Sequence, residues 1–309
     1  MTASKRAILI AGPTASGKSG LALALAERHD GVVINADSMQ VYRELRILTA
    51  RPSPADEARA PHALYGLVSG AEAYSAGRYA ADAAAAIAGA RAAGKMPIVV
   101  GGTGLYFKVL LEGLSPVPQV DPDARAYWRA QAAQRPSAEL HALLALRDPE
   151  TAGRLMPSDP QRIVRALEVL ESTGRPLSDW QRTPGEPILT EADTVRLAIL
   201  PDREATVQTI ERRFDAMLEG GALEEARALL ALGFSWELPV MRALGVAPLA
   251  AHIEGRTSRV EAAAQAKADT RQYAKRQLTW LRSNMITWKI VHTQEIQSFM
   301  RDNLSFIDS

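Results

Sequence analysis

Residues 7–19 read Ala-Ile-Leu-Ile-Ala-Gly-Pro-Thr-Ala-Ser-Gly-Lys-Ser and carry the strongest structural signal in the chain. Their first five residues form an apolar run that is typical of a buried parallel strand. The rest completes the pattern Gly-x4-Gly-Lys-Ser/Thr, in which backbone N–H groups and a helix N-terminus bind phosphate oxygens together. A helix is expected over residues 19–28, where leucine and alanine recur at helical spacing. The stretch therefore predicts a strand, a phosphate-binding loop and a helix.

The expected diphosphate-binding residues are those of the loop: Gly12, Pro13, Thr14, Ala15, Ser16, Gly17, Lys18 and Ser19. Lys18 would add a positive charge, and the Ser19 hydroxyl would ligate Mg²⁺. An enzyme that hydrolyses a nucleotide normally has an acidic residue at the end of a neighbouring strand. Here the apolar residues 98–100 run into Gly101-Gly102 instead. This favours a bound donor whose phosphates leave intact.

Further apolar runs at residues 32–34, 97–100 and 194–200 predict additional strands, and a short last strand is expected near residues 288–291. Helices are expected over residues 79–93 and from 203 to 285. Strands that alternate with helices at this spacing predict an α/β fold with right-handed crossovers. We expect a parallel sheet with helices on both faces, similar to the core of P-loop NTPases.

The pattern changes after residue 114. A proline-containing junction leads into an all-helical segment from residue 122 to about 174, and residues 175–190 read as a loop. The predicted organisation is an α/β core of residues 1–114 and 191–309, interrupted by an all-helical insertion domain at residues 115–190.

Composition narrows the class of protein. The chain has 309 residues with 36 Lys and Arg against 35 Asp and Glu, so a globally basic protein is excluded, although a local basic face is not. The absence of cysteine excludes a disulfide scaffold, an iron–sulfur cluster and a cysteine nucleophile. The alanine-rich residues 80–93 contain Asp82 and Arg91 and do not read as a membrane span. With no export-type cleavage site after residue 12, a cytoplasmic protein is expected.

Two polar residues follow predicted strands. Ligands of open α/β sheets bind at the carboxyl ends of the strands, so Asp37 is expected beside the phosphate loop, where its carboxylate could act as a general base. The alternative is that Asp37 only caps the next helix, with Ser38 as a competing cap. Thr103 follows two glycines that permit a close approach to phosphate, and its alternative is a plain glycine-rich turn.

Five segments together resemble the tRNA dimethylallyltransferases, also called tRNA isopentenyltransferases, and the resemblance covers nearly the whole chain. The segments are Gly-Pro-Thr-Ala-Ser-Gly-Lys-Ser (12–19), Asn-Ala-Asp-Ser-Met-Gln-Val-Tyr (35–42), Gly-Gly-Thr-Gly-Leu-Tyr-Phe-Lys (101–108), Asp-Pro-Gln-Arg-Ile-Val-Arg-Ala-Leu-Glu-Val (159–169) and Asp-Thr-Arg-Gln-Tyr-Ala-Lys-Arg-Gln-Leu-Thr-Trp-Leu-Arg (269–282).

The resemblance implies transfer of a dimethylallyl group from its diphosphate to the exocyclic amine of the adenosine 3′ of the anticodon, in tRNAs that read codons beginning with U. It implies Mg²⁺ as cofactor and a set of catalytic residues, namely Asp37, Thr103, Lys18 and Arg213. Asp37 would take the amine proton, Thr103 would contact a diphosphate oxygen, and Arg213 would neutralise the leaving group. Arg212 is adjacent to Arg213, which leaves that assignment open by one position.

The resemblance also implies a surface for the tRNA anticodon stem-loop, with the helical insertion as a clamp. The implied contacts are Asp37, Ser38, Met39, Gln40, Thr103, Arg125, Gln161, Arg162, Ile163, Val164, Arg165, Arg242 and Gly245. Residues 255–289 carry eight Lys and Arg against two acidic residues, a pattern that favours contact with a phosphate backbone. Alternatively, Tyr273, Gln277 and Trp280 are helically spaced and pack on the core. A monomer without membrane contact is expected.

Three other functions remain open from the residues. A P-loop kinase of a small metabolite would use Asp37 as base for a hydroxyl. An isopentenyltransferase acting on a free adenine nucleotide would have no need of the 161–165 segment. A non-enzymatic RNA-binding switch would bind but not consume an allylic diphosphate.

Overall fold

The computed structural model describes residues 6–302, which form two compact units. The core unit comprises the residues up to Leu111 and those from Ile188 onward, and the helical unit comprises Glu112–Pro187. The insertion expected at residues 115–190 and this helical unit differ by three residues at each end.

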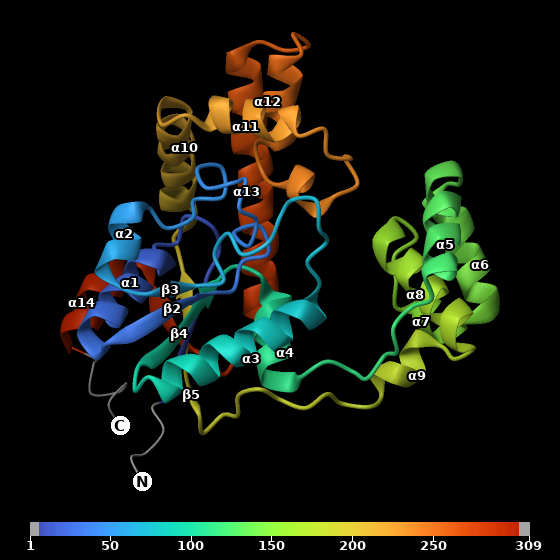
Figure 1. The fold of residues 1–309 in the computed structure, drawn as a ribbon, viewed down its shortest axis with the longest axis horizontal. Helices are drawn as coiled ribbons and strands as arrows, with labels where there is room; N and C mark the ends of the chain where they lie inside the picture. Colours follow the sequence, from blue (N-terminus) through green and yellow to red (C-terminus); the bar gives the residue numbers. More distant parts are fainter. Residues whose placement is uncertain (1–5, 303–309) are drawn as a thin grey trace. The chain divides into compact units, whose positions relative to one another are not determined.

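One sheet of six parallel strands forms the centre of the core unit (Figure 1), in the order β3-β2-β4-β1-β5-β6. The strands are β1 (Ala7–Ala11), β2 (Gly31–Asn35), β3 (His62–Ala63), β4 (Met96–Gly101), β5 (Thr194–Leu200) and β6 (Lys289–His292). β1 lies between β4 and β5, and its Ile10 pairs with Val100 on one side and Leu197 on the other. The predicted parallel sheet is confirmed. β3 was not predicted, because two residues at a sheet edge leave no periodic signal.

Both faces of the sheet are buried because alternate strand residues point to opposite sides. Leu9 of β1 packs in one hydrophobic cluster with Val99 of β4, whereas Ile8 and Ile98 pack in the other. Helices α3 (Ala76–Ala92), α4 (Gly104–Glu112) and α13 (Arg259–Asn284) contribute to the first cluster. Helices α1 (Lys18–His29) and α14 (Ile296–Asp302) contribute to the second. The expected helices on both faces are therefore present.

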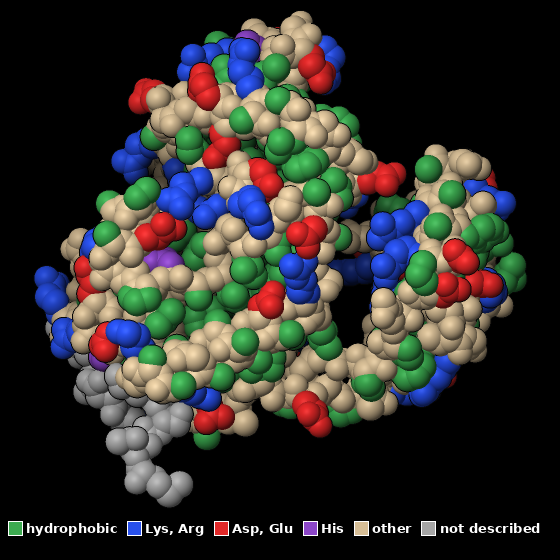
Figure 2. Space-filling model, viewed as in Figure 1, with side chains coloured by type: hydrophobic (Ala, Val, Ile, Leu, Met, Phe, Trp, Pro, Cys, Tyr) green, Lys and Arg blue, Asp and Glu red, His purple; other side chains and the backbone are tan. Residues whose placement is uncertain are grey.

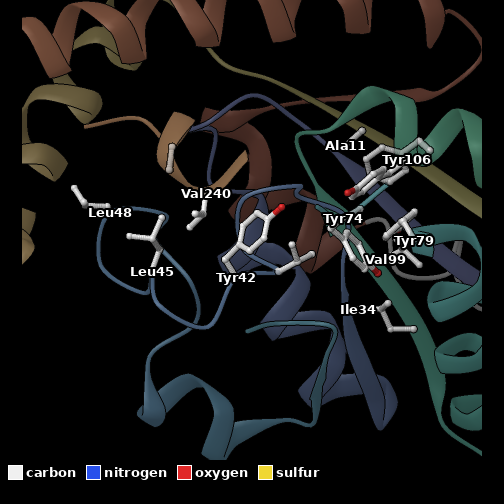
Figure 3. Close-up of a cluster of buried hydrophobic side chains, with 14 of the residues drawn as sticks. Ala11, Ile34, Tyr42, Leu45, Leu48, Tyr74, Tyr79, Val99, Tyr106 and Val240 are labelled. Carbon is white, nitrogen blue, oxygen red and sulfur yellow. The ribbon is translucent and has the colours of Figure 1, made fainter. Parts of the chain in front are cut away.

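Four tyrosines pack around the segment that leaves β2 (Figure 3). The rings of Tyr79 and Tyr106 are stacked, with centroids 3.7 Å apart. The Tyr74 hydroxyl donates to Asp82 Oδ2 at 2.8 Å, and Tyr42 is buried in the same cluster. Large aromatic side chains bury much apolar area with few rotatable bonds. This cluster therefore gives the chain after β2, where Asp37 lies, a rigid support.

The core unit contains further helices and short 3-10 turns. The helices are α2 (Pro54–Arg59), α10 (Arg203–Glu219), α11 (Ala222–Ala231) and α12 (Val246–Ile253), and the 3-10 turns lie at Pro239–Arg242 and Thr293–Glu295. α13 is the longest helix and begins with a capping box between Ser258 and Glu261. Its buried residues recur every three or four positions, so that one stripe faces the core.

The helical unit contains α5 (Pro122–Gln134), α6 (Ser137–Arg147), α7 (Pro149–Gly153), α8 (Pro160–Thr173) and α9 (Leu177–Gln181). Trp128, Leu140 and Ile163 are in its small core. The prediction of a loop over residues 175–190 is wrong at α9. One local and one tertiary contact stabilise this turn. The Arg175 guanidinium lies 4.6 Å from the centre of the nearby Trp180 ring, and Ser178 N–H donates to Thr151 Oγ1 of α7.

α14 was not predicted, and the part of residues 298–309 that follows residue 302 lies outside the described residues. No helix within residues 6–302 is long and apolar enough to cross a membrane. Figure 2 shows Lys and Arg side chains interspersed with Asp and Glu over the visible face, in keeping with the net charge of +1.

Candidate active site

The predicted phosphate loop follows β1 at the middle of the sheet, where Gly12 N–H donates to the Gly101 carbonyl at 3.2 Å. Ala15 and Gly17 have positive φ angles of 63° and 83°. For Ala15 this left-handed backbone costs about 1 kcal/mol, and such conformations make the concave N–H arrangements that bind anions. Gly17 caps α1 without a side-chain hydrogen bond, so the first-turn N–H groups remain available to a phosphate.

Three polar side chains of the loop differ in their surroundings. The Ser16 hydroxyl is buried and has no hydrogen-bond partner among the described residues. Ser19 is exposed in the first turn of α1. Lys18 is partly buried, and its Nζ donates to the Pro13 carbonyl at 3.1 Å. Burial lowers the pKa of Lys18 to about 8, although the Asp37 carboxylate opposes this shift. A bound anion would stabilise the charged form of this ammonium and so compensate for the hydration that burial removes.

Asp37 closes a turn directly after β2. Its N–H donates to Asn35 Oδ1 at 2.8 Å, and its own Oδ1 accepts from Met39 N–H at 2.9 Å. Oδ2 accepts no hydrogen bond from any described residue. One carboxylate oxygen therefore stabilises the turn, and the other is available to a ligand. The alternative that Asp37 caps the next helix is wrong, because the next helix is α2, which begins at Pro54 and is capped by Ser53. Asp37 closes a turn instead, and this is compatible with the base role.

Thr103 connects the end of β4 to the Asp37 turn. Its Oγ1 accepts from Ser38 N–H at 2.9 Å and donates to Ser38 Oγ at 3.3 Å, while its own N–H donates to the Ala36 carbonyl. A Cβ on Gly101 would lie 2.0 Å from the Ala36 oxygen, so the glycine is required for this approach. Thr103 is thus tied into the structure more tightly than a plain glycine-rich turn would require.

Arg213 is the arginine of α10 that reaches the phosphate loop, where its Nη2 donates to Thr14 Oγ1. Burial lowers the pKa of Arg213, and the Asp37 charge counteracts this. Arg212 is exposed. The structure therefore distinguishes the two arginines, because a step of one residue turns the side chain by about 100° around a helix.

A cavity of about 270 Å³ lies over these groups within the core unit. Its polar lining includes Thr14, Asp37, Ser38, Thr49, Arg213, Arg242, Thr270, Tyr273 and Arg276, and its apolar lining includes Met39, Leu48, Ile210, Phe214, Met217 and Leu244. Burial, followed by the Asp37 charge, raises the pKa of Tyr273, which keeps its hydroxyl protonated. The cavity combines three arginines, one carboxylate and an apolar wall.

Of the other expected RNA contacts in the core unit, Met39 and Arg242 line the cavity. The Gln40 amide instead donates to the Thr49 and Ala50 carbonyls, so this side chain holds a loop. Gly245 is buried with φ of 89°, and a Cβ there would lie 3.0 Å from Leu48 Cδ2. Gly245 therefore contributes a backbone turn.

The remaining expected RNA contacts lie in the helical unit. Gln161 and Arg162 are exposed in the first turn of α8, and Arg125 is half-buried on α5. Arg165 Nη1 lies 3.7 Å from the buried Glu168 carboxylate. The Ile163 and Val164 side chains are buried in the unit's own hydrophobic core, so a contact of these two residues with RNA would involve their backbone and stays a prediction.

Several lining residues were not singled out from the sequence. Ile210, Phe214 and Met217 are spaced four and three residues apart on α10, a pattern that predicts a buried helix face but not a cavity wall. Thr49 lies in an irregular loop that has no periodic signal. For Tyr273 and Gln277 the sequence leaves two interpretations open, packing on the core and contact with RNA. In the structure, Tyr273 lines the cavity and Gln277 is buried.

Comparison with known protein families gives two matches. The model of the IPP transferase family matches residues 40–284, and the model of an isopentenyl transferase family matches residues 5–63. The first match covers most of the chain, including the helical unit, and the second covers the phosphate loop and the Asp37 turn.

Individual proteins that are similar to this chain carry names that agree with these two family models. A tRNA dimethylallyltransferase of Parvibaculum lavamentivorans is 54% identical over 303 residues, covering 98% of this chain and 96% of that protein. One from Methylobacterium nodulans is 57% identical over 279 residues, covering 90% and 91%. A crystal structure of a eukaryotic dimethylallyltransferase acting on tRNA matches with a TM-score of 0.83 at 28% identity, covering 98% of this chain and 77% of that one. A tRNA isopentenylpyrophosphate transferase of Bacillus halodurans gives 0.69 at 29%, covering 98% and 97%.

The Lys18 environment predicts a pH-dependent affinity for inorganic diphosphate. The cation binds the anion, and with a pKa of about 8 it is lost as the pH rises. The dissociation constant should therefore rise about tenfold between pH 7 and pH 9. Isothermal titration calorimetry at several pH values measures it. Lys18→Met should bind weakly with little pH dependence, and Lys95→Met, a change in a surface ion pair, should follow the wild type. An equal alkaline loss in Lys18→Met would contradict this role.

The difference between the two arginines predicts an asymmetric pair of variants. Arg213→Lys removes the guanidinium that reaches Thr14 and should weaken diphosphate binding about tenfold, because a lysine does not reproduce a planar donor. Arg212→Lys, on the exposed side of α10, should stay within about twofold of the wild type. The same calorimetric titration compares them, and a larger effect at position 212 would reverse the assignment.

Proposed function

The chain belongs to the family of tRNA dimethylallyltransferases, and from this premise we propose that it transfers a dimethylallyl group from dimethylallyl diphosphate to an adenosine amine in tRNA. The acceptor is the adenosine immediately 3′ of the anticodon, in tRNAs that read codons beginning with U. The observation that supports this most is the cavity in which a free carboxylate oxygen, three arginines and an apolar wall meet.

The phosphate loop binds the diphosphate. Its backbone N–H groups, Lys18 and Arg213 neutralise charge that develops on the bridging oxygen as the bond to the allylic carbon breaks. The exposed Ser19 hydroxyl is a hard oxygen donor at the same helix N-terminus. Among residues 6–302 no three His, Cys, Asp or Glu side chains are grouped to hold a metal. Mg²⁺ takes few protein ligands and otherwise phosphate oxygens and water. Bound there, Mg²⁺ would supply further positive charge to the leaving group.

Asp37 accepts the proton. The amine nitrogen attacks the first carbon of the dimethylallyl group, the carbon–oxygen bond breaks with its electron pair leaving on diphosphate, and one amine proton passes to Asp37 Oδ2. Ser38 and Thr103 hold the turn that carries this carboxylate. The apolar side chains of Leu48, Phe214 and Met217 surround the hydrocarbon and exclude water from the allylic centre.

The RNA is bound by both units. The adenosine must leave its stack to enter a cavity, as for other enzymes that act on bases. Met39 and Arg242 lie on the cavity wall, and Arg125, Gln161, Arg162 and Arg165 of the helical unit contact the anticodon stem-loop. We further propose that the enzyme acts as a monomer. Because its substrate is tRNA, we place the reaction in the cytoplasm.

A transfer assay tests the reaction. Purified protein with Mg²⁺ and radiolabelled dimethylallyl diphosphate is offered unmodified tRNA, AMP or the same tRNA with guanosine in place of the target adenosine. Label is expected in the first acceptor alone. Label in AMP would identify a nucleotide isopentenyltransferase. Consumption of ATP in a parallel reaction, without transfer of label to any acceptor, would favour the kinase.

The base role predicts a selective defect for Asp37→Asn. Asparagine retains the oxygen that accepts from Met39 N–H, so the turn is kept, but its amide does not accept the substrate proton. The kcat should fall about 10²- to 10⁴-fold, while tRNA affinity in a filter-binding assay should be unchanged. Asp30→Asn, at the end of α1, is the control. Turnover of Asp37→Asn near the wild-type rate would leave Asp37 with its turn-closing role alone.

A further inference from the structure

Gln277 of α13 is a buried polar side chain that joins two loops of the site. Its Oε1 accepts from Thr14 N–H of the phosphate loop at 2.9 Å, and its Nε2 donates to the Gly102 carbonyl at 2.9 Å. Both ends of the amide are therefore used. Each partner lies on a loop that follows a different strand, Thr14 after β1 and Gly102 after β4.

The backbone is shaped to admit this side chain. A Cβ on Gly102 would lie 2.2 Å from Gln277 Nε2, and a Cβ on Gly104 would lie 2.2 Å from the Trp280 ring. Gln277 and Trp280 are three residues apart and thus neighbours on one face of α13. Gly102 and Gly104 therefore leave room for the Gln277 and Trp280 side chains of α13. The close contact between α13 and the segment after β4 depends on these two glycines.

Each joined loop also carries groups of the proposed reaction. On the phosphate loop, the Thr14 hydroxyl accepts from Arg213, and Lys18 follows four residues later. On the other loop, Thr103 is next to Gly102 and holds Ser38 of the Asp37 turn. The Gln277 amide therefore adds a side-chain link, beside the backbone bond from Gly12 N–H to the Gly101 carbonyl, between the groups that hold the leaving group and those that hold the base.

We propose that Gln277 is a positioning residue that fixes the diphosphate-binding loop against the Thr103 loop, and so aligns donor and base; this rests on the proposed transferase function. Misalignment of reacting groups by about 1 Å is enough to cost a factor of about 100 in rate. Among similar side chains, glutamine alone supplies an acceptor and a donor at this reach. Glutamate has no donor when ionised, and methionine has the length without either bond.

Gln277→Met is the first test. The side-chain volume is kept and both hydrogen bonds are lost, so kcat/KM for dimethylallyl diphosphate should fall about tenfold or more. The affinity for tRNA alone, measured by filter binding, should stay within about twofold. Gln265→Met is the matched control, because that glutamine lies on the exposed side of the same helix and bonds only Asp269 among the described residues. Thermal unfolding of both variants reports whether they are folded.

Gln277→Glu gives a pH signature that packing alone does not produce. The ionised carboxylate has no donor for the Gly102 carbonyl, whereas the protonated carboxyl donates there and accepts from Thr14 N–H. Burial raises the pKa of a carboxyl at this position, so part of it takes up a proton as the pH is lowered from 8 to 6. The rate deficit of Gln277→Glu relative to the wild type at the same pH should therefore shrink over this range. The deficit of Gln277→Met should be constant over this range.

Gly102→Ala approaches the same contact from the other side. The added methyl group would displace the amide, and this variant should lose rate by about the same factor as Gln277→Met. The double variant should lose little more than either single one, since both remove the same link.

The outcomes distinguish a failure of the proposed transferase function from a failure of the positioning role of Gln277. Absence of transfer by the wild type would refute the proposed function itself. Wild-type transfer together with normal kcat/KM in Gln277→Met, or equal, pH-independent deficits in the Met and Glu variants, would refute the positioning role and leave Gln277 as a packing residue. A Gln277→Met variant that also loses tRNA affinity would refute it as well.

Discussion

The site depends on the parallel alignment of β1, β2 and β4. Parallel strands end at the same edge of a sheet, so the loops that follow them meet there even though they are far apart in the sequence. The phosphate loop, the Asp37 turn and the Thr103 loop are these three loops. Their spacing is set by backbone contacts, such as Gly12 N–H to the Gly101 carbonyl and Thr103 N–H to the Ala36 carbonyl. Side chains then add function to a geometry that the sheet already provides.

Charge at this edge is arranged for a ligand that is strongly anionic. Lys18 and Arg213 both have lowered pKa values because burial removes water from them, and Asp37 is the nearby carboxylate that opposes both shifts. Such cations are costly in the free protein and gain most when an anion arrives. The same carboxylate is the proposed proton acceptor. One negative charge therefore holds two cations at the site without neutralising them and serves the chemistry as well.

Local signals explain what could be predicted from the sequence. The phosphate loop and its flanking strand and helix follow from a contiguous pattern, and the alternation of strands and helices implies the sheet. Other features depend on contacts that no local pattern contains. Arg212 and Arg213 are adjacent residues of the same type, so the sequence does not tell which of them faces the site. The way α10 packs on the core leaves Arg212 exposed and turns Arg213 toward the phosphate loop. Ile163 and Val164 lie in a segment that matches the family pattern, yet their burial comes from α5 and α6. At α9, Ser178 N–H finds the Thr151 Oγ1 acceptor 27 residues away, a contact that no local pattern contains.

Gln277 shows how one residue can fit two interpretations at once. Its helical spacing with Tyr273 and Trp280 correctly indicates a buried face of α13, while its amide bonds Thr14 and Gly102, which are 263 and 175 residues away. A buried polar group is costly unless it is fully bonded, so a glutamine on a packed face implies partners for both of its ends. In this fold those partners are backbone groups of the two loops that bracket the cavity. α13 therefore has two different faces. Lys275 and Arg276 are exposed on one, and Gln277 on the other is hydrogen-bonded to both catalytic loops.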